Sequence, residues 1–344
     1  MKRILKAAAL VFVLLFTLLL TAGCGQEQDA SKKISLLFPD PAAGGPWKIV
    51  GPLCQKYVSE AGYECKMESC TSPQDQVERL KAAIAEKPAC IVLAVQDAMI
   101  FGDALKAAKE AQIPVIAYDR LVMHTDAISY YASFDNAAVG EFMGRFIEEK
   151  LNLKSGAGPF TMEFVAGDPA DMNAPVFYQG AYDRLKPYID KGQLVIPSGQ
   201  IAFKDVATEG WSADKAKARM ETVLRQHYAG RNLDVVVAAN DDLADAVLQA
   251  QKSVGYQGSP TLITGQDAGD KAIENIRAGR QAMTIYKDPN VLCAKVVRMV
   301  KAVVEGSQPA INDVQNIKND VKTIPSYLCI PVIVDKDNID TVKK

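Results

Sequence analysis

Apolar, strand-like runs along this chain repeatedly end in short polar clusters. Four such pairs of run and cluster are Ile113–Ala117 with Tyr118-Asp119-Arg120, Val235–Ala238 with Ala239-Asn240-Asp241, Leu262–Thr264 with Gly265-Gln266-Asp267, and Met283–Ile285 with Tyr286-Lys287-Asp288. In open parallel α/β sheets, ligands bind in the crevice beyond the carboxyl ends of the strands. Carboxylates, amides and cations at that edge suit a ligand rich in hydroxyls, because each hydroxyl both donates and accepts hydrogen bonds. The pattern therefore predicts a sugar-binding cleft.

Strand-like and helix-like segments alternate over most of the chain. Predicted strands include Ile34–Phe38, Tyr63–Glu68, Ile91–Val95, Ile128–Phe134, Phe160–Val165 and Leu194–Pro197, separated by helical patterns such as Trp47–Ala61 and Ala174–Leu185. Ser72 followed by Pro73 has the form of a helix N-terminus, with a capping hydroxyl and a proline in the first turn. The alternation favours βαβ units and a mainly parallel α/β fold. Two comparable halves predict two lobes with a cleft between them.

The N-terminal segment has the form of a secretory signal. Basic residues precede an uncharged run, Ala7–Leu20, which is shorter than the ~20 residues that a membrane-spanning helix needs. The sequence that follows resembles a bacterial lipoprotein signal, with Thr21 where an aliphatic residue is more usual and Cys24 as the residue to be acylated; an ordinary secretory signal with a chance cysteine is the alternative. We expect a signal peptide at 1–23, a flexible tether at 24–33, and an extracytoplasmic domain that lipid anchors to the bacterial cell membrane.

The composition and motifs of the chain argue against nucleic-acid binding and against several classes of enzyme. The net charge of −2, without a long basic run, argues against a nucleic-acid partner. Only two histidines are present, and the chain lacks a nucleophile elbow, a His-Glu-x-x-His motif and a dinucleotide glycine fingerprint. A glycosidase could use two carboxylates such as Asp119 and Asp267, but their separation does not follow from the sequence. We expect no enzyme, no catalytic residues and no cofactor.

Six cysteines remain besides Cys24, and their pairing is left open by the sequence. They are Cys54, Cys65, Cys70, Cys90, Cys293 and Cys329. None of their spacings resembles a zinc site, so we expect no metal. Cys293 lies on an apolar helical stripe, which is compatible with either a buried free thiol or a disulfide.

Seven short stretches, in the same order along the chain, resemble the periplasmic sugar-binding proteins of ABC importers, of the ribose, galactose and xylose type. These are Ala117–Arg120, Tyr131–Asn136, Gly167–Ala174, Gly210–Trp211, Ala239–Asp241, Gly265–Asp267 and Thr284–Lys287. The xylose-binding and multiple-sugar-binding branch is the most similar. The resemblance implies an α/β fold of two Rossmann-like lobes with parallel sheets joined by a three-segment hinge, the type I periplasmic binding protein fold. The lobes would be 33–133 plus 288–324, and 134–287 plus 325–344.

The resemblance also implies the ligand-binding residues. They are Trp47, Asp119, Arg120, Asp171, Asn173, Trp211, Asn240, Asp267 and Lys287. All but Trp211 have a structural alternative: Asp119 and Arg120 could form a local ion pair, Trp47 could pack at a helix start, Lys287 could be solvated, and the other acids and amides could be helix caps. The two tryptophans would cover the C–H faces of a pyranose. Relatives in the xylose branch carry an arginine immediately before the first tryptophan, and here that residue is Pro46, which leaves the identity of the sugar open.

The expected function is capture of a monosaccharide, a xylose-like aldopentose or a related aldohexose, for delivery to the permease of an ABC importer. Hinge closure around the sugar would create the shape that the partner recognises. The alternative partner is a membrane histidine kinase or chemoreceptor that senses the closed form. We expect the protein to be a monomer.

Overall fold

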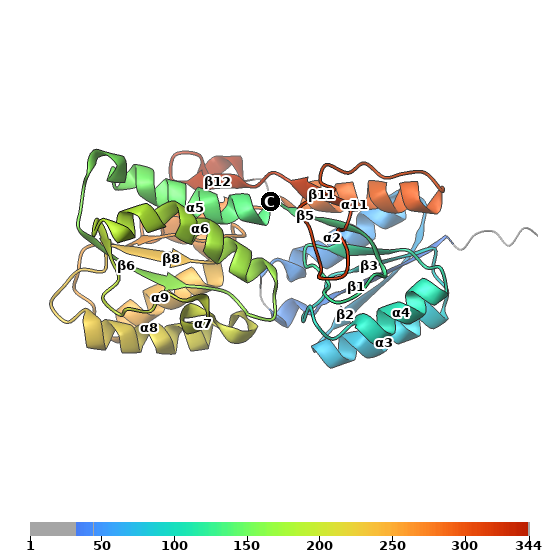
Figure 1. Cartoon of the computed structure of the whole chain (residues 1–344), viewed down its shortest axis with the longest axis horizontal. Helices are drawn as coiled ribbons and strands as arrows, with labels where there is room; N and C mark the ends of the chain where they lie inside the picture. Colours follow the sequence, from blue (N-terminus) through green and yellow to red (C-terminus); the bar gives the residue numbers. More distant parts are fainter. Residues whose placement is uncertain (1–31, 44, 343–344) are drawn as a thin grey trace, which may run out of the picture.

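A computed structural model describes residues 32–43 and 45–342 of the chain. The signal predicted at 1–23, the proposed lipid-bearing Cys24 and all but the end of the tether lie outside the described residues. Within the described part of the chain, none of the helices combines the length and the apolar character required for a membrane span. The molecule consists of two lobes side by side (Figure 1).

The first lobe is built on a six-stranded sheet. Its strands are β1 (Lys33–Pro39), β2 (Glu64–Cys70), β3 (Cys90–Leu93), β4 (Val115–Tyr118), β5 (Ile128–Phe134) and β11 (Ser326–Cys329). They lie in the order β2-β1-β3-β4-β5-β11, and every neighbouring pair is parallel. The order 2-1-3-4-5 is that of a doubly wound fold, whose ligand crevice lies at the carboxyl ends of the strands.

Helices cover both faces of this sheet. One face packs against α2 (Trp47–Glu60) and α11 (Pro289–Val304), and the other against α3 (Pro73–Ala85) and α4 (Gly102–Glu110). The helix start predicted at Ser72 is confirmed, because Ser72 Oγ accepts a hydrogen bond from the backbone N–H of Asp75 at 3.1 Å. A disulfide joins Cys54 of α2 to Cys293 of α11, which resolves the pairing that the sequence left open. The described cysteines 65, 70, 90 and 329 are free thiols.

The second lobe repeats the same strand order. Its strands are β6 (Phe160–Val165), β7 (Leu194–Val195), β8 (Val235–Ala238), β9 (Leu262–Ile263), β10 (Met283–Tyr286) and β12 (Val332–Asp335). Four of them form a parallel sheet in the order β7-β6-β8-β9, and a parallel bridge between Gln266 and Ile285 places β10 next. Strand β12 pairs with β10 in the antiparallel sense. Both lobes therefore have the doubly wound order, in which ligands bind beyond the carboxyl ends of the strands.

Helices also cover both faces of the second sheet. α5 (Asn136–Lys150) and α6 (Asn173–Asp190) pack on one face, and α8 (Ala213–His227) and α9 (Asp241–Ser253) pack on the other. Gly140 allows α5 and α6 to approach closely, since a Cβ there would lie 2.1 Å from the carbonyl oxygen of Phe177. The remaining elements are α7 (Phe203–Val206), α10 (Asp270–Arg277), η1 (Pro41–Ala43), η2 (Leu153–Ser155), η3 (Glu209–Trp211) and η4 (Ile339–Thr341).

Three segments connect the lobes: those between β5 and α5, between β10 and α11, and between β11 and β12. The third differs from the expected boundary between residues 324 and 325. Ser326–Cys329 belongs to the first lobe, because it forms β11 beside β5, and Asp135 N donates to the carbonyl of Cys329 at 2.8 Å. The chain therefore reaches the second lobe only after Cys329.

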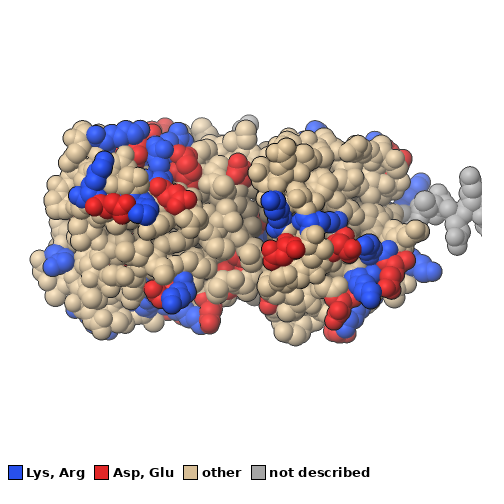
Figure 2. Space-filling view, viewed as in Figure 1, with Lys and Arg blue, Asp and Glu red and all other residues tan. Residues whose placement is uncertain are grey.

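Charged side chains are distributed over both lobes. On the face shown in Figure 2, lysines and arginines alternate with aspartates and glutamates.

Candidate functional site

A cleft between the lobes brings together all nine residues that the sequence predicted as ligand contacts. It is lined by Trp47, Asp119, Arg120, Asp171, Asn173, Trp211, Asn240, Asp267 and Lys287, together with Gly45, Pro46, Phe177 and Gln266. Gly45, Pro46, Trp47, Asp119 and Arg120 come from the first lobe, and the others come from the second lobe or from its connection to the first. Their contact with a ligand stays a prediction, but their convergence is a property of the fold.

Asp119 directly follows β4, and hydrogen bonds to its backbone carbonyl fix its position. Its φ of +60° turns the chain sharply at the end of the strand, a conformation that aspartate tolerates better than most residues. The carbonyl oxygen of Asp119 accepts hydrogen bonds from the hydroxyls of Tyr131, at 2.7 Å, and Ser133, at 3.1 Å. Burial raises the pKa of the Asp119 carboxyl, while the nearby ammonium of Lys287 acts in the opposite direction. The backbone is therefore fixed while the carboxyl remains directed to the cleft.

Arg120 crosses the cleft. Its Nε lies 3.0 Å from Asp171 Oδ2 of the second lobe, and both side chains are largely buried. Its guanidinium also lies over the indole of Trp47, 5.3 Å from the ring centroid, and donates to the carbonyl of Val95 at 3.3 Å. The local Asp119–Arg120 ion pair considered from the sequence is replaced by a pair between the lobes.

Asn173 is the first residue of α6, and its side chain also spans the lobes. Its Nδ2 donates to the carbonyl of Asp119 at 2.9 Å, and its Oδ1 accepts from Asn136 Nδ2 at 2.8 Å. Neither Asn173 nor Asp171 is the N-cap of α6, since Met172 occupies that position without a side-chain cap. Asp171 Oδ1 instead accepts from Asn173 N at 3.0 Å and so shapes the loop before the helix.

Trp211 covers one wall of the cleft from the short η3 element. Its backbone has a φ of +53°, and its ring packs directly on Gly167, where a Cβ would lie 2.1 Å from the indole. The indole Nε1 is buried without a hydrogen-bond partner among the described residues. The other tryptophan, Trp47, both belongs to the first-lobe core and lines the cleft.

Asn240 and Asp267 follow β8 and β9 and differ in their local roles. Asn240 is the N-cap of α9, with its Oδ1 accepting from Leu243 N at 2.9 Å. Asp267 caps no helix, because Gly269 is the N-cap of α10. The Asp267 carboxylate instead lies 3.3 Å from Lys287 Nζ. The capping alternative therefore holds for Asn240 and fails for Asp267.

Lys287 lies where the chain leaves β10 for the first lobe. Burial alone would lower the pKa of Lys287, but the carboxylates of Asp267 and Asp119 outweigh it, so the pKa is raised and the ammonium stays charged. Its Nζ lies 5.7 Å from the centroid of the Phe177 ring. The solvated lysine considered from the sequence is thus excluded, since the side chain is only 11% exposed.

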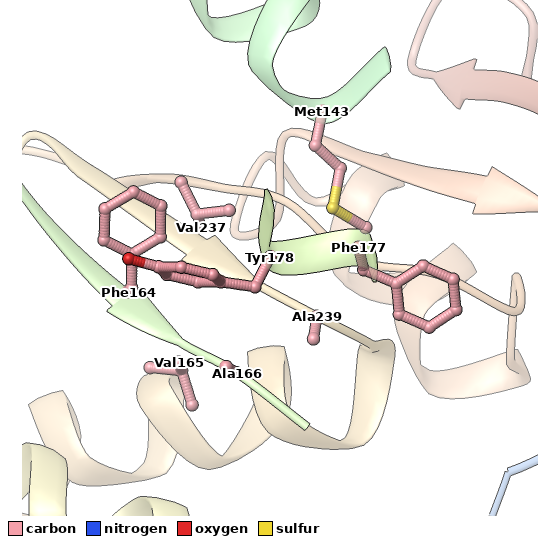
Figure 3. Close-up of a pocket in the computed structure, with 8 residues that line it drawn as sticks. All are labelled: Met143, Phe164, Val165, Ala166, Phe177, Tyr178, Val237 and Ala239. Carbon is pink, nitrogen blue, oxygen red and sulfur yellow. The ribbon is translucent and has the colours of Figure 1, made fainter. Parts of the chain in front are cut away.

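Phe177 and Gln266 are cleft residues that the sequence analysis did not select. Figure 3 shows the Phe177 ring directed away from Phe164 and Tyr178, which pack around a small apolar cavity of about 10 Å³ behind the cleft. That cavity is at the lower limit for one water molecule. Gln266 donates to the carbonyl of Ala239 at 3.2 Å, and its Oε1 is buried without a partner among the described residues. The position of Gln266 in the polar cluster Gly265-Gln266-Asp267 was the sequence feature that could have identified it as a cleft residue.

The lobes are closed onto each other. Backbone Ala98 N donates to the carbonyl of Ala170 at 3.2 Å, and Gly45 N donates to Asp242 Oδ2 at 3.3 Å, both across the cleft. The cavity directly between the site side chains is about 40 Å³. Within the described residues, His, Cys, Asp and Glu form no group that could hold a metal ion. The site therefore presents hydrogen-bond donors and acceptors from two lobes that are in contact.

Comparisons with known proteins agree with this geometry. Residues 37–308 match the family model of the periplasmic binding protein domain. The multiple sugar-binding periplasmic receptor ChvE of Rhizobium radiobacter is 38% identical over 87% of this chain and 86% of its own length. The D-xylose-binding periplasmic protein of Escherichia coli is 30% identical over 87% of this chain and 86% of its own length.

A solved structure extends the match to three dimensions. The ABC transporter solute-binding protein of Clostridium phytofermentans, determined with bound β-D-glucose, superimposes with a TM-score of 0.87. It is 40% identical, with 90% of this chain and 95% of that chain covered. The chain therefore belongs to the periplasmic binding protein family, in the branch that includes the multiple-sugar-binding and xylose-binding proteins, and is an extracytoplasmic binding protein of the type I α/β fold rather than an enzyme.

Proposed function

We propose that this protein captures a monosaccharide in its pyranose form, such as D-glucose or D-xylose, and presents it to an ABC importer. The observation that carries the proposal is the cleft, in which carboxylates, amides, two cations and two tryptophans converge from both lobes. Relatives named for sugar binding, and one solved with glucose, support the same substrate class.

Each group has a chemical role towards such a ligand. Asp119 and Asp267 accept hydrogen bonds from hydroxyls, whereas Arg120 and Lys287 donate to hydroxyl or ring oxygens. Trp211 covers a C–H face of the ring while the hydroxyl rim contacts the polar residues. Because these groups belong to two lobes, one sugar would bridge them and favour the closed form.

The sugar would enter and leave by a hinge motion. The Arg120–Asp171 and Asp267–Lys287 ion pairs line the closed cavity, which leaves a space of only about 40 Å³ between them. A pyranose therefore requires the lobes to part, as in other binding proteins that close around their ligand. The permease of the importer would then recognise the closed shape of a monomer.

Lipid anchoring through Cys24 is part of the proposal. The acylated cysteine would hold the binding domain at the outer surface of the cell membrane, beside the importer. Metabolic labelling with an alkyne-tagged fatty acid tests this step. The label should appear on the wild-type protein and disappear in Cys24→Ala, and equal labelling of both would refute the anchor.

The binding function is tested by calorimetric titration of residues 26–344 with D-glucose, D-xylose, D-galactose, L-arabinose, D-ribose and myo-inositol. Saturable binding of at least one pyranose, with a matching rise in the thermal midpoint, is the expected result, because a ligand that binds only the folded state stabilises it. No binding of any of these sugars would overturn the proposal.

A further inference from the structure

A second cavity opens beside the sugar cleft. It measures about 620 Å³, within the range of small-molecule sites. Six residues line both spaces, namely Gly45, Pro46, Trp47, Asp119, Asp267 and Lys287. The two spaces therefore adjoin each other at these residues, and we call the second one the side cavity.

The side cavity has one apolar wall and one acidic wall. The apolar wall comes from the first lobe and includes Pro46, Ile49 and Pro289. Ile49 is 60% exposed although it is a large aliphatic side chain at the start of α2. Such exposure needs no explanation for a single residue, but here the residue lines a large cavity that adjoins the sugar cleft.

The opposite wall carries carboxylates of the second lobe. Asp241 and Asp242, in the first turn of α9, and Asp270, in the first turn of α10, line the side cavity. Asp242 also accepts the hydrogen bond from Gly45 N that joins the lobes at the border of the two spaces. An apolar surface facing hydrogen-bond acceptors is the same combination that the cleft presents to its own ligand.

We propose that the side cavity is a subsite for a second sugar ring, so that the protein also binds a disaccharide with one ring in the cleft and the other in the side cavity. The C–H face of the second ring packs on Pro46, Ile49 and Pro289, and its hydroxyls donate to Asp242 and Asp270. This inference rests on the proposed function, because the first ring must occupy the sugar cleft.

The test compares D-glucose with cellobiose, maltose and gentiobiose by calorimetric titration of the purified protein. At least one disaccharide should bind no more weakly than D-glucose. Ile49→Trp, which places extra volume at the mouth of the side cavity, should weaken that disaccharide by about tenfold or more, because overfilled sites bind poorly. The same variant should leave D-glucose binding within about twofold, because the cleft itself is unchanged.

Val314→Trp is the matched control. Val314 is also an exposed aliphatic residue, at 57%, but it lines neither the cleft nor the side cavity. It should alter neither affinity, and thermal midpoints establish that both variants fold.

Each other outcome contradicts the subsite. If D-glucose binds and all three disaccharides fail, the side cavity is not a sugar subsite, although the proposed function stands. If a disaccharide binds equally well to wild type and to Ile49→Trp, its second ring lies elsewhere. If none of the four sugars binds, both the subsite and D-glucose as a ligand are refuted. The titration with D-xylose, L-arabinose and D-ribose then tests the proposed function separately.

Discussion

Asp267→Asn isolates the charge of one cleft carboxylate. The side chain of Asp267 lies 3.3 Å from Lys287 Nζ and is 16% exposed. Its backbone has a φ of +95°, and its N–H donates to the carbonyl of Ile285 at 2.8 Å. Asparagine tolerates positive φ better than alanine does, so this substitution keeps the backbone and the shape of the side chain while it removes the charge.

The expected loss follows from the hydrogen bonds that the carboxylate can make. A hydrogen bond to a charged group contributes about 1.5–3 kcal/mol, and a neutral one contributes about 0.5–1.5 kcal/mol. If the carboxylate accepts from two sugar hydroxyls, neutralising it costs about 2–3 kcal/mol of binding free energy, and the dissociation constant rises about 30- to 150-fold.

The assay is calorimetric titration with D-glucose and D-xylose, paired with thermal unfolding in the absence of sugar. Asp214→Asn is the control, because Asp214 is an exposed acid in the first turn of α8 and lies outside the cleft. The control should bind as the wild type does. If Asp267→Asn folds normally and binds the preferred sugar within about threefold of wild type, the role assigned to this carboxylate is refuted.

Three further predictions concern groups around the cleft and the first-lobe core. Gly167→Ala should weaken sugar binding by about tenfold or more in calorimetry, since the added Cβ would lie 2.1 Å from the Trp211 ring and displace it. Burial raises the pKa of Asp241 from 3.8 to about 8, so between these values the folded state keeps a proton that the unfolded state has released, and stability falls as pH rises. Asp241→Asn should therefore raise the thermal midpoint by several degrees more at pH 8 than at pH 5, and an equal change at the two pH values would contradict the raised pKa of Asp241. Replacing Cys54 and Cys293 together by alanine should lower the unfolding free energy by about 2–4 kcal/mol in a denaturant titration, because the disulfide closes a long loop; an unchanged midpoint and slope would show that the crosslink contributes nothing.

The alternation of apolar runs and helical stripes was enough to predict the α/β class and the two lobes. The third connection between the lobes was predicted before residue 325, whereas it follows Cys329. The prediction was wrong because Ser326–Cys329 is a short segment of mixed polarity at the edge of a sheet. Its assignment to the first lobe depends on backbone hydrogen bonds with β5, which lies almost two hundred positions earlier. The pattern of apolar and polar residues in a short stretch of sequence does not indicate which distant strand that stretch pairs with. The Cys54–Cys293 disulfide, 239 residues apart in sequence, was undetermined for the same reason.

The site was more accessible to sequence reasoning than the connections were, because polar residues that follow buried strands collect at one sheet edge. Phe177 was missed because it lies inside a helix and contributes to the core as well as to the cleft. Its 3% exposure is that of an ordinary core residue. Only the position of α6 against the first lobe shows that one edge of the ring reaches the ligand space.

The structural and the binding interpretations of the polar residues turn out to be compatible for a physical reason. In this fold the helices begin where the strands end, so the residues that can cap a helix are the ones that border the cleft. Asn240 caps α9 with its Oδ1, which leaves its amide nitrogen to donate into the cleft. Asp171 likewise divides its two oxygens between the loop before α6 and Arg120. These local hydrogen bonds fix the two side chains in position, and a fixed side chain loses less conformational entropy when a ligand binds. A helix cap at this edge is therefore an argument for a preorganised binding residue rather than against one.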